Sequence, residues 1–283
     1  ISGNTIEARR TGIFHNLHYG TASPMTFSNN TIDALANANE TRWDGIALSS
    51  LAVPSISTNN TSNGNGNAAS NVSKGYEIWN VAAPITNSTI TGGSVSGVDI
   101  GVFANNYDGY SSDAPDGSYA TISGVTITPS ITGVGVRIYD NALATSHAPV
   151  RLDLSGCTIS GGLEGVKFEE TQAGTVGGTI NNNNISASGI GVNVNSMVTS
   201  VSNVFSVTNN TINITGQTAG ANPTSAVFLR QLTGTTAATI SGNTITGPFY
   251  GYLAYNLNTT PVTEIDGGTI SGVLQGVAFI NID

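Results

Sequence analysis

The chain has 283 residues, of which 39% are hydrophobic and only 9% are charged, and its formal net charge is −9. The negative charge and the lack of a basic stripe exclude nucleic acid as an expected partner. No apolar stretch is long enough to span a bilayer, which argues against membrane insertion. The chain has a single cysteine, Cys157, so it cannot form an internal disulfide. Amphipathic helical patterns are absent while Asn, Thr, Ser, Gly and Ile recur evenly, so we expect one all-β domain over residues 1–283.

Taken in chain order, the sequence repeats a six-residue unit: an apolar residue, a polar residue, Gly or Asn, a position that is often Asn, then Thr and Ile. Ten copies begin at Ile1, Phe27, Ser57, Ile85, Ile122, Leu154, Ile180, Val207, Ile240 and Ile265. The nine steps between residues 1 and 265 average about 29 residues each. A period of this length predicts a solenoid in which each repeat forms one coil.

The interior of the unit indicates a bend. Its first and sixth positions are apolar in most copies, although residues five apart on a straight strand point to opposite faces of a sheet. The third position is always Gly or Asn, the residue types that best tolerate a left-handed backbone conformation. We therefore expect a corner at that position, with the apolar residues on both sides of it facing one interior.

The fourth position of the unit is Asn in six copies: Asn4, Asn30, Asn60, Asn183, Asn210 and Asn243. If coils stack at the usual strand spacing of about 4.8 Å, these amides lie above one another and can hydrogen-bond along the stack. A second strand usually opens with Gly and an apolar residue, as in Gly135-Val136, and we align Ser225-Ala226 with this pair in the eighth coil. These patterns predict a right-handed parallel β-helix solenoid of about ten coils.

One face combines much of the chain's scarce charge. In coils five and six, polar or ionic residues occupy the outward positions of the second strand and the positions just beyond them. These are the candidate catalytic and binding residues: Arg137, Tyr139, Asp140, Lys167, Glu169 and Glu170. One interpretation is a shallow carbohydrate groove in which a basic residue acts beside a carboxylate. The other is a ladder of exposed ion pairs, each worth roughly a few tenths of a kcal/mol. The only histidines, His15, His18 and His147, form no compact motif with aspartates, which favours the second interpretation.

The longest loop, residues 104–121, mixes carboxylates with tyrosines. With Tyr139 from the neighbouring strand, it supplies the remaining ligand-binding candidates: Tyr107, Tyr110, Asp108, Asp113 and Asp116. The three aspartates could coordinate Ca²⁺ through oxygen atoms, and the tyrosine rings could stack on a sugar. Asp-Gly and Pro-Asp-Gly steps are also ordinary turn chemistry, so a solvated loop is the alternative.

The fifth position of the unit, usually Thr, is expected to form an outward column. Local Thr-Ile-Thr sequences occur at residues 89–91, 126–128 and 244–246. A regular Thr array on a flat β face is one way to bind ice, which makes ice binding a minor alternative. Irregular coil lengths argue against a flat lattice match, and exposed strands favour Thr for their own reasons.

The Asn-Asn-Thr-Ile corner followed by Gly-Val-x-apolar, in coils of this length, resembles the right-handed parallel β-helix proteins of the pectin-lyase-like superfamily. The resemblance covers essentially the whole chain and is closest in style to repeat regions of bacterial surface and secreted proteins. Members of the superfamily include polysaccharide lyases and hydrolases, epimerases, phage tailspikes and surface adhesins. The resemblance therefore implies the fold and leaves the activity open. It also implies that an enzyme of this kind would use a basic residue with calcium-binding acids, or clustered aspartates.

We expect a non-catalytic, extracellular or cell-surface β-helix, a structural or adhesive region of a large secreted protein with polysaccharide or cell-surface glycan as its partner. No cofactor is expected, and Ca²⁺ is the one candidate ion. The alternatives are a polysaccharide-active lyase or hydrolase and a tailspike-like module. The sequence begins inside a repeat and ends on an apolar strand. We therefore expect an internal segment that is flanked by neighbouring domains of the same chain.

Overall fold

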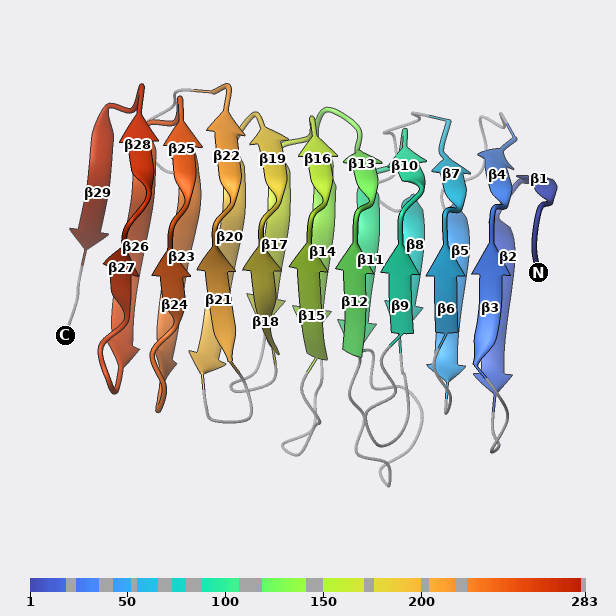
Figure 1. Ribbon diagram of the computed structural model, residues 1–283, viewed down its shortest axis with the longest axis horizontal. Helices are drawn as coiled ribbons and strands as arrows, with labels where there is room; N and C mark the ends of the chain where they lie inside the picture. The colour runs from blue at the N-terminus through green and yellow to red at the C-terminus, as the bar shows by residue number, and fades with distance from the viewer. Residues whose placement is uncertain are drawn as a thin grey trace.

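The computed structural model describes residues 1–18, 24–35, 43–51, 55–65, 73–79, 88–106, 119–140, 150–170, 176–199, 204–216 and 223–280. Within these ranges the chain forms three parallel sheets, and successive strands pass from one sheet to the next so that each sheet pairs strands three elements apart (Figure 1). The predicted all-β parallel β-helix is therefore confirmed. Within the described ranges, no helix has the length and hydropathy needed to cross a membrane.

We call the three sheets A, B and C. Sheet A contains β3 (Met25–Ser28), β6 (Ser55–Thr58), β9 (Ser88–Thr91), β12 (Tyr119–Ser123), β15 (Val150–Ser155), β18 (Val176–Asn181), β21 (Phe205–Thr208), β24 (Thr239–Ser241) and β27 (Glu264–Asp266). Sheet B contains β1 (Thr5–Ala8), β4 (Thr31–Ala34), β7 (Thr61–Asn63), β10 (Ser94–Ser96), β13 (Thr126–Thr128), β16 (Thr158–Ser160), β19 (Asn184–Ala187), β22 (Thr211–Ile214), β25 (Thr244–Thr246) and β28 (Thr269–Ser271). Sheet C contains β2 (Thr11–His18), β5 (Asp44–Leu51), β8 (Lys74–Trp79), β11 (Ile100–Asn106), β14 (Val134–Asp140), β17 (Glu164–Glu170), β20 (Ile190–Thr199), β23 (Ser225–Gly234), β26 (Tyr250–Thr259) and β29 (Gln275–Ile280).

The predicted corners join sheet A to sheet B. Nine of the predicted corner residues have φ between 51° and 67°, in the left-handed region: Gly3, Asn29, Asn59, Gly124, Gly156, Asn182, Asn209, Gly242 and Gly267. The bend turns the first and sixth positions of each unit toward one interior, so that Ile122 and Ile127 are both fully buried. The predicted corner is therefore confirmed wherever the structure describes it.

The fourth copy of the unit was placed wrongly at Ile85. Its proposed corner, Asn87, lies outside the described residues, whereas Ile90 pairs with Ser57 on one side and Ile122 on the other. The corner of this coil is Gly92-Gly93, with φ of 62° and 79°. The unit therefore runs over residues 90–95, and its glycine pair was hidden by a nearby sequence that matches the consensus better.

The glycine that opens most sheet C strands is required by close packing between coils. A Cβ atom on Gly135 would lie 2.4 Å from Cγ2 of Ile159 and 2.6 Å from the carbonyl oxygen of Gly165, both in the next coil. Equivalent contacts of 2.2–2.4 Å to an Ile or Val side chain occur at Gly12, Gly75, Gly101, Gly165 and Gly191. The glycine stripe therefore lets the branched side chain of the next coil rest directly on the backbone.

The alignment of the eighth coil was wrong by one residue. Ile190 pairs with Ser225 and Val192 with Val227, so Ala226, and not Ser225, occupies the position of the glycine stripe. Because successive strand residues point to opposite faces, this slip reverses the predicted orientation of the side chains from Val227 to Arg230.

The asparagine column forms two hydrogen-bonded ladders. In each step an Asn Nδ2 donates to the Oδ1 of the next Asn, at 3.0 Å from Asn4 to Asn30, 2.9 Å from Asn30 to Asn60, 3.0 Å from Asn183 to Asn210 and 3.1 Å from Asn210 to Asn243. Except for Asn4, these asparagines are buried. Gly93, Val125 and Cys157 occupy the same column between the two ladders. The expected stacking of amides along the coils is present.

A second column of left-handed residues was not predicted. Ser196, Gln231 and Asn256 have φ of 63°, 59° and 53° and lie one above another in β20, β23 and β26. The bend turns Met197 and Leu232 into the core, where neither is exposed to solvent. It lengthens these three strands around a further corner, beside the candidate site described next.

Candidate functional site

The outer face of sheet C carries a row of charged, amide and aromatic side chains. Val136 and Ile138 point inward and are fully buried, so the alternating residues Arg137 and Tyr139 point outward. The register then stacks two outward columns across β14, β17, β20 and β23: Arg137, Lys167, Asn193 and Phe228 in one, and Tyr139, Glu169, Asn195 and Arg230 in the other. The backbone positions of neighbouring residues in a column are therefore about 4.8 Å apart, which is the usual spacing between adjacent strands.

The predicted charged residues form a connected ion network. Arg137 donates to Oε2 of Glu169 through Nη2 at 2.7 Å and Nε at 3.2 Å. Lys167 Nζ lies 3.6 Å from the same oxygen and 3.9 Å from Oε2 of Glu164. The Arg137 guanidinium also lies over the Tyr139 ring, 5.0 Å from its centroid. Both cations thus have carboxylate partners, and because these side chains are partly exposed the pairs contribute at most about 1 kcal/mol each.

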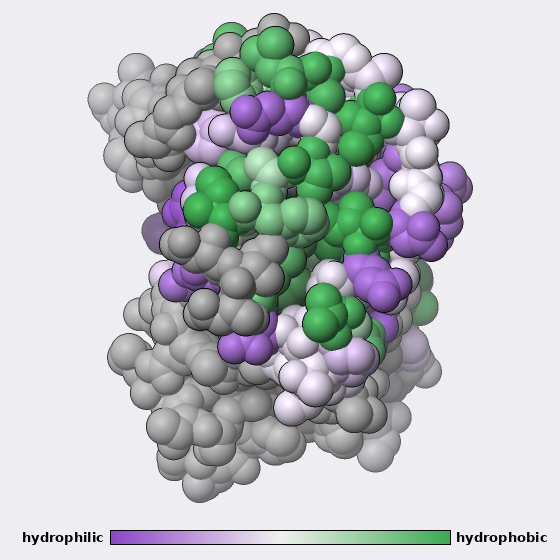
Figure 2. All heavy atoms as spheres, turned by 90° about the vertical axis from the view of Figure 1, so that its left-hand side faces the viewer, coloured by the Kyte–Doolittle hydropathy of each residue, from purple (hydrophilic) through white to green (hydrophobic). Residues whose placement is uncertain are grey.

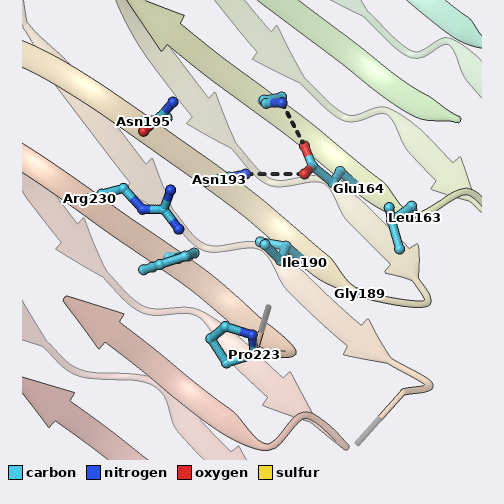
Figure 3. Close-up of a pocket in the computed structure, with 10 residues that line it drawn as sticks. Leu163, Glu164, Gly189, Ile190, Asn193, Asn195, Pro223 and Arg230 are labelled. Atoms are coloured by element: carbon cyan, nitrogen blue, oxygen red, sulfur yellow. Dashed lines mark hydrogen bonds and ion pairs between the residues drawn. The ribbon is translucent and has the colours of Figure 1, made fainter. Parts of the chain in front are cut away.

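Beside this network, between β17, β20 and β23, lies a depression of about 440 Å³ (Figure 3). Its lining includes Glu164, Lys167, Asn193, Asn195, Pro223, Phe228 and Arg230. Asn193 Nδ2 donates to Oε1 of Glu164 at 3.2 Å, which fixes one wall. A second depression of about 250 Å³ shares Pro223, Phe228 and Arg230 and extends to Tyr255 and Asn256. The two hollows therefore meet at Arg230.

Arg230 differs from the other cations of this face. Its guanidinium lies 4.9 Å from the centroid of the Phe228 ring, and that ring makes an edge contact with Tyr255 at 5.6 Å. Phe228 is only 2% exposed although it points outward from sheet C, so it is a fixed support for the exposed arginine. Among the described residues no carboxylate pairs with Arg230. A guanidinium that is oriented by an aromatic ring and has no ion-pair partner can bind a carboxylate, sulfate or phosphate group.

The structure brings four of the predicted residues together: Arg137, Tyr139, Lys167 and Glu169. Asp140 and Glu170 pair at the ends of β14 and β17, but their side chains lie outside the described part of the structure. Tyr107, Tyr110, Asp108, Asp113 and Asp116 also lie outside the described residues. In the part of the chain that is described, no three His, Cys, Asp or Glu side chains form a group that could hold a metal ion.

Sequence reasoning missed the residues that shape the depression, above all Phe228 and Arg230. With Ser225 at the glycine position, both residues fall on the inner face of the coil; with the observed register, both point outward. The alternating pattern of β23 could have revealed the correct register, because Val227 and Leu229 suit the two inward positions better than Ala226 and Phe228 do.

A buried ionic cluster on the same face was also missed. Lys74 contacts Glu77, lies 3.9 Å from Oδ1 of Asp44, and sits over the Phe103 ring at 5.0 Å from its centroid. All three charged residues are at most 6% exposed. A cluster buried this deeply favours one arrangement of β5, β8 and β11, because separating the charges would leave one unpaired in the interior.

The hydroxyl-rich face of sheet B has a more regular spacing of strands than the irregular coil lengths led us to expect. Between each sheet A strand and the following sheet B strand there are always two residues, so the variation in coil length falls elsewhere. Residues 89–91, however, lie entirely in sheet A, and the sheet B strand of that coil is Ser94–Ser96. Several side chains on this face bond to one another, as when Thr246 Oγ1 donates to Asn213 Oδ1 at 3.0 Å.

The single cysteine belongs to the core. Cys157 is 1% exposed, and burial raises the pKa of its thiol. Burial likewise raises the pKa of the Tyr76 and Tyr252 hydroxyls, which bond to Ser57 and Asn243 near the ends of the two asparagine ladders. These groups are therefore neutral packing elements at physiological pH and are not reactive sites.

Comparison of the chain with protein-family models, with curated proteins and with solved structures finds no match.

Proposed function

We propose that the chain is a non-catalytic, extracellular or cell-surface β-helix, a structural or adhesive region that binds glycans at the depression between β17, β20 and β23. The observation that carries the proposal is the Arg230 guanidinium, which is held over Phe228 where two hollows meet and pairs with no carboxylate among the described residues. Asn193 and Asn195 line the same depression and can exchange hydrogen bonds with sugar hydroxyls. Shallow hollows on an elongated face suit a polymer better than a small enclosed ligand.

Arg230 also indicates the kind of glycan. Within the described part of the chain no carboxylate offsets its charge, whereas the charges of Arg137 and Lys167 are offset by Glu169 and Glu164. An anionic substituent, a uronate or a sulfate, would therefore bind near Arg230 while neutral ring faces contact Phe228 and Tyr255. Calcium at Asp108, Asp113 and Asp116, and membership of the pectin-lyase-like superfamily, remain further parts of this proposal.

The main alternative is a polysaccharide lyase or hydrolase, or a tailspike-like module, that uses the same face. Its candidate base, Lys167, lies within 4 Å of carboxylate oxygens of Glu164 and Glu169 and so belongs to an ion network, which supports the non-catalytic proposal.

Replacing Arg230 by alanine should weaken binding of dextran sulfate at least about tenfold, because one charge-assisted contact is lost. Unsulfated dextran has the same backbone and should be unaffected. Titration calorimetry with each polymer measures both Kd values. Arg151→Ala removes the same charge from sheet A, where Arg151 is already paired with Asp153, and it is the matched control.

Equal weakening by both arginine variants would mean non-specific charge attraction and would contradict the proposed site. Cleavage of dextran sulfate or alginate that disappears in Lys167→Ala would support the enzyme instead. Freezing-point depression by the chain without any glycan would support the ice-binding alternative on sheet B.

A further inference from the structure

The depression between β17, β20 and β23 has two chemically different ends. Arg230 and Asn195 lie at one end, and Leu163, Gly189 and Ile190 lie at the other (Figure 3). Arg230 is the register partner of Asn195, whereas Ile190 is five residues earlier than Asn195 in β20. At the usual rise per strand residue, five steps span up to about 16 Å. A ligand that reaches both ends must therefore be longer than a single sugar ring.

The end at Leu163 offers aliphatic surface, and its backbone groups are already used. The backbone amide of Leu163 donates to the Gly133 carbonyl at 2.8 Å, and those of Gly189 and Ile190 both donate to the Leu163 carbonyl, at 2.9 and 3.0 Å. The Gly189 carbonyl accepts from the Ser225 amide at 3.1 Å. Leu163 is 48% exposed, and Ile190 is half-buried. What this end provides for a ligand is therefore contact with carbon atoms.

A glycine in the next coil makes room for the Leu163 side chain. A Cβ atom on Gly189 would lie 2.9 Å from Leu163 Cδ1 and 2.8 Å from the Leu163 carbonyl oxygen. Other exposed apolar residues lie elsewhere: Ile131 lines neither hollow, and Val277 and Phe279 belong to the last described coil, whose apolar middle Figure 2 shows. Leu163 is thus an exposed aliphatic side chain that is held at the edge of a hollow.

Amides line the depression between its two ends. Asn193 Nδ2 donates to Oε1 of Glu164 at 3.2 Å, which turns Asn193 Oδ1 away from that carboxylate. Within the described part of the chain, Asn193 Oδ1 accepts no hydrogen bond and the Asn195 side chain makes none. The Asn193 oxygen can accept from the N–H of an acetamido group, and the Asn195 amide can both donate to and accept from sugar hydroxyls.

We propose that this depression selects a glycan in which a uronate adjoins a sugar that carries an acetamido group. The inference rests on the proposed glycan site at Arg230 and names the class of ligand for it. The uronate carboxylate binds the Arg230 guanidinium, the acetamido N–H donates to Asn193 Oδ1, and the acetyl methyl group contacts Leu163 and Ile190. Because the two ends are too far apart for one sugar, the carboxylate and the acetyl group belong to neighbouring units of the polymer.

A methyl group suits the Leu163 end better than a sugar ring does. The aromatic residue in the lining of this depression is Phe228, and it supports Arg230 at the opposite end. Branched aliphatic side chains without free hydrogen-bonding groups favour a small apolar substituent, whereas the hydroxyls around a sugar ring would lose their hydrogen bonds to water there. The acetyl group is therefore the feature that this end recognises.

Calorimetric titration with hyaluronan and alginate oligosaccharides of equal length tests the inference. Hyaluronan alternates glucuronate with N-acetylglucosamine, whereas alginate consists of uronates alone, so hyaluronan should bind more tightly although it carries fewer carboxylates. Leu163→Asn should weaken hyaluronan binding about fivefold, the loss expected for one methyl contact, and leave alginate binding unchanged. Leu163→Met keeps an apolar side chain of similar volume and should retain the preference. Ile131→Asn, at an 81% exposed position outside both hollows, is the matched control.

Tighter binding of alginate than of hyaluronan would overturn the inference, as would equal losses for both polymers in Leu163→Asn. Binding of dextran sulfate that depends on Arg230, without binding of hyaluronan, would also overturn it and leave the proposed site standing. Hyaluronan binding that is insensitive to Arg230→Ala would contradict the proposed site itself. Circular dichroism checks the fold of each variant, and Ile190→Thr, which keeps the β-branched shape, repeats the test from β20 if Leu163→Asn disturbs the coil.

Discussion

Gly135→Val is expected to prevent folding, or to lower the free energy of unfolding by more than about 4 kcal/mol. A Cβ at residue 135 would lie 2.4 Å from Ile159 Cγ2 and 2.6 Å from the Gly165 carbonyl oxygen, so two coils would have to separate. Valine adds two further methyl groups at that point and is a stronger test than alanine, since Ala226 occupies the equivalent position in its own coil. Urea unfolding followed by circular dichroism measures the loss.

The matched control is Gly124→Asn. Gly124 lies at a corner with φ of 62°, a Cβ there meets no atom within 4 Å, and asparagine occupies the same corner in other coils. Its unfolding free energy should change by less than about 1 kcal/mol. If both glycine variants were equally destabilised, close packing between coils would not be the reason for the glycine stripe.

Asn210→Ala should lower the free energy of unfolding by about 2–4 kcal/mol. Asn210 Oδ1 accepts from the backbone amide and Nδ2 of Asn183 at 2.9 and 3.0 Å, and its own Nδ2 donates to the Ile180 carbonyl at 2.8 Å. Alanine would leave the two Asn183 donors in a buried site without this acceptor. Thermal unfolding by calorimetry, which also reports the enthalpy, is the measurement.

Asn184→Ala is the control for the ladder, because Asn184 follows a ladder residue but points to solvent from sheet B. It should shift the unfolding free energy by no more than about 0.5 kcal/mol. An Asn210 variant as stable as the Asn184 variant would show that the ladder contributes little, and that burial of the isoleucine columns alone holds the coils in register.

The sequence was sufficient for the fold because the same local constraint recurs in every coil. A residue that must be left-handed is Gly or Asn, and a residue that must face the interior is Ile, Val or Leu, so the corner is visible without any long-range information. The glycine pair at 92 and 93 was missed because the neighbouring sequence fits the consensus better. Ser196 and Gln231 could not be found in this way, because serine and glutamine rarely take the left-handed conformation and only the stack above and below holds them there.

The candidate site was only half predictable. Arg137, Lys167 and Glu169 were found because their strands open with a clear Gly-Val pair, which fixes the alternation of side chains. Phe228 and Arg230 were missed because alanine replaces glycine in β23, and a slip of one residue turns an outward side chain inward. The contact between Arg230 and Phe228 also depends on rotamers, which no sequence pattern specifies.

The central claim is that the coils stack in the observed register, with the fourth corner at Gly92-Gly93, and paired cysteines test it most directly. Ser94 and Thr126 are register partners in sheet B, so a Ser94→Cys/Thr126→Cys variant in a Cys157→Ala background should form an internal disulfide on mild oxidation. Thr89 instead pairs with Thr121 in sheet A, so Thr89→Cys/Thr126→Cys should stay reduced. A disulfide in the second pair and none in the first would contradict the register and the site built on it.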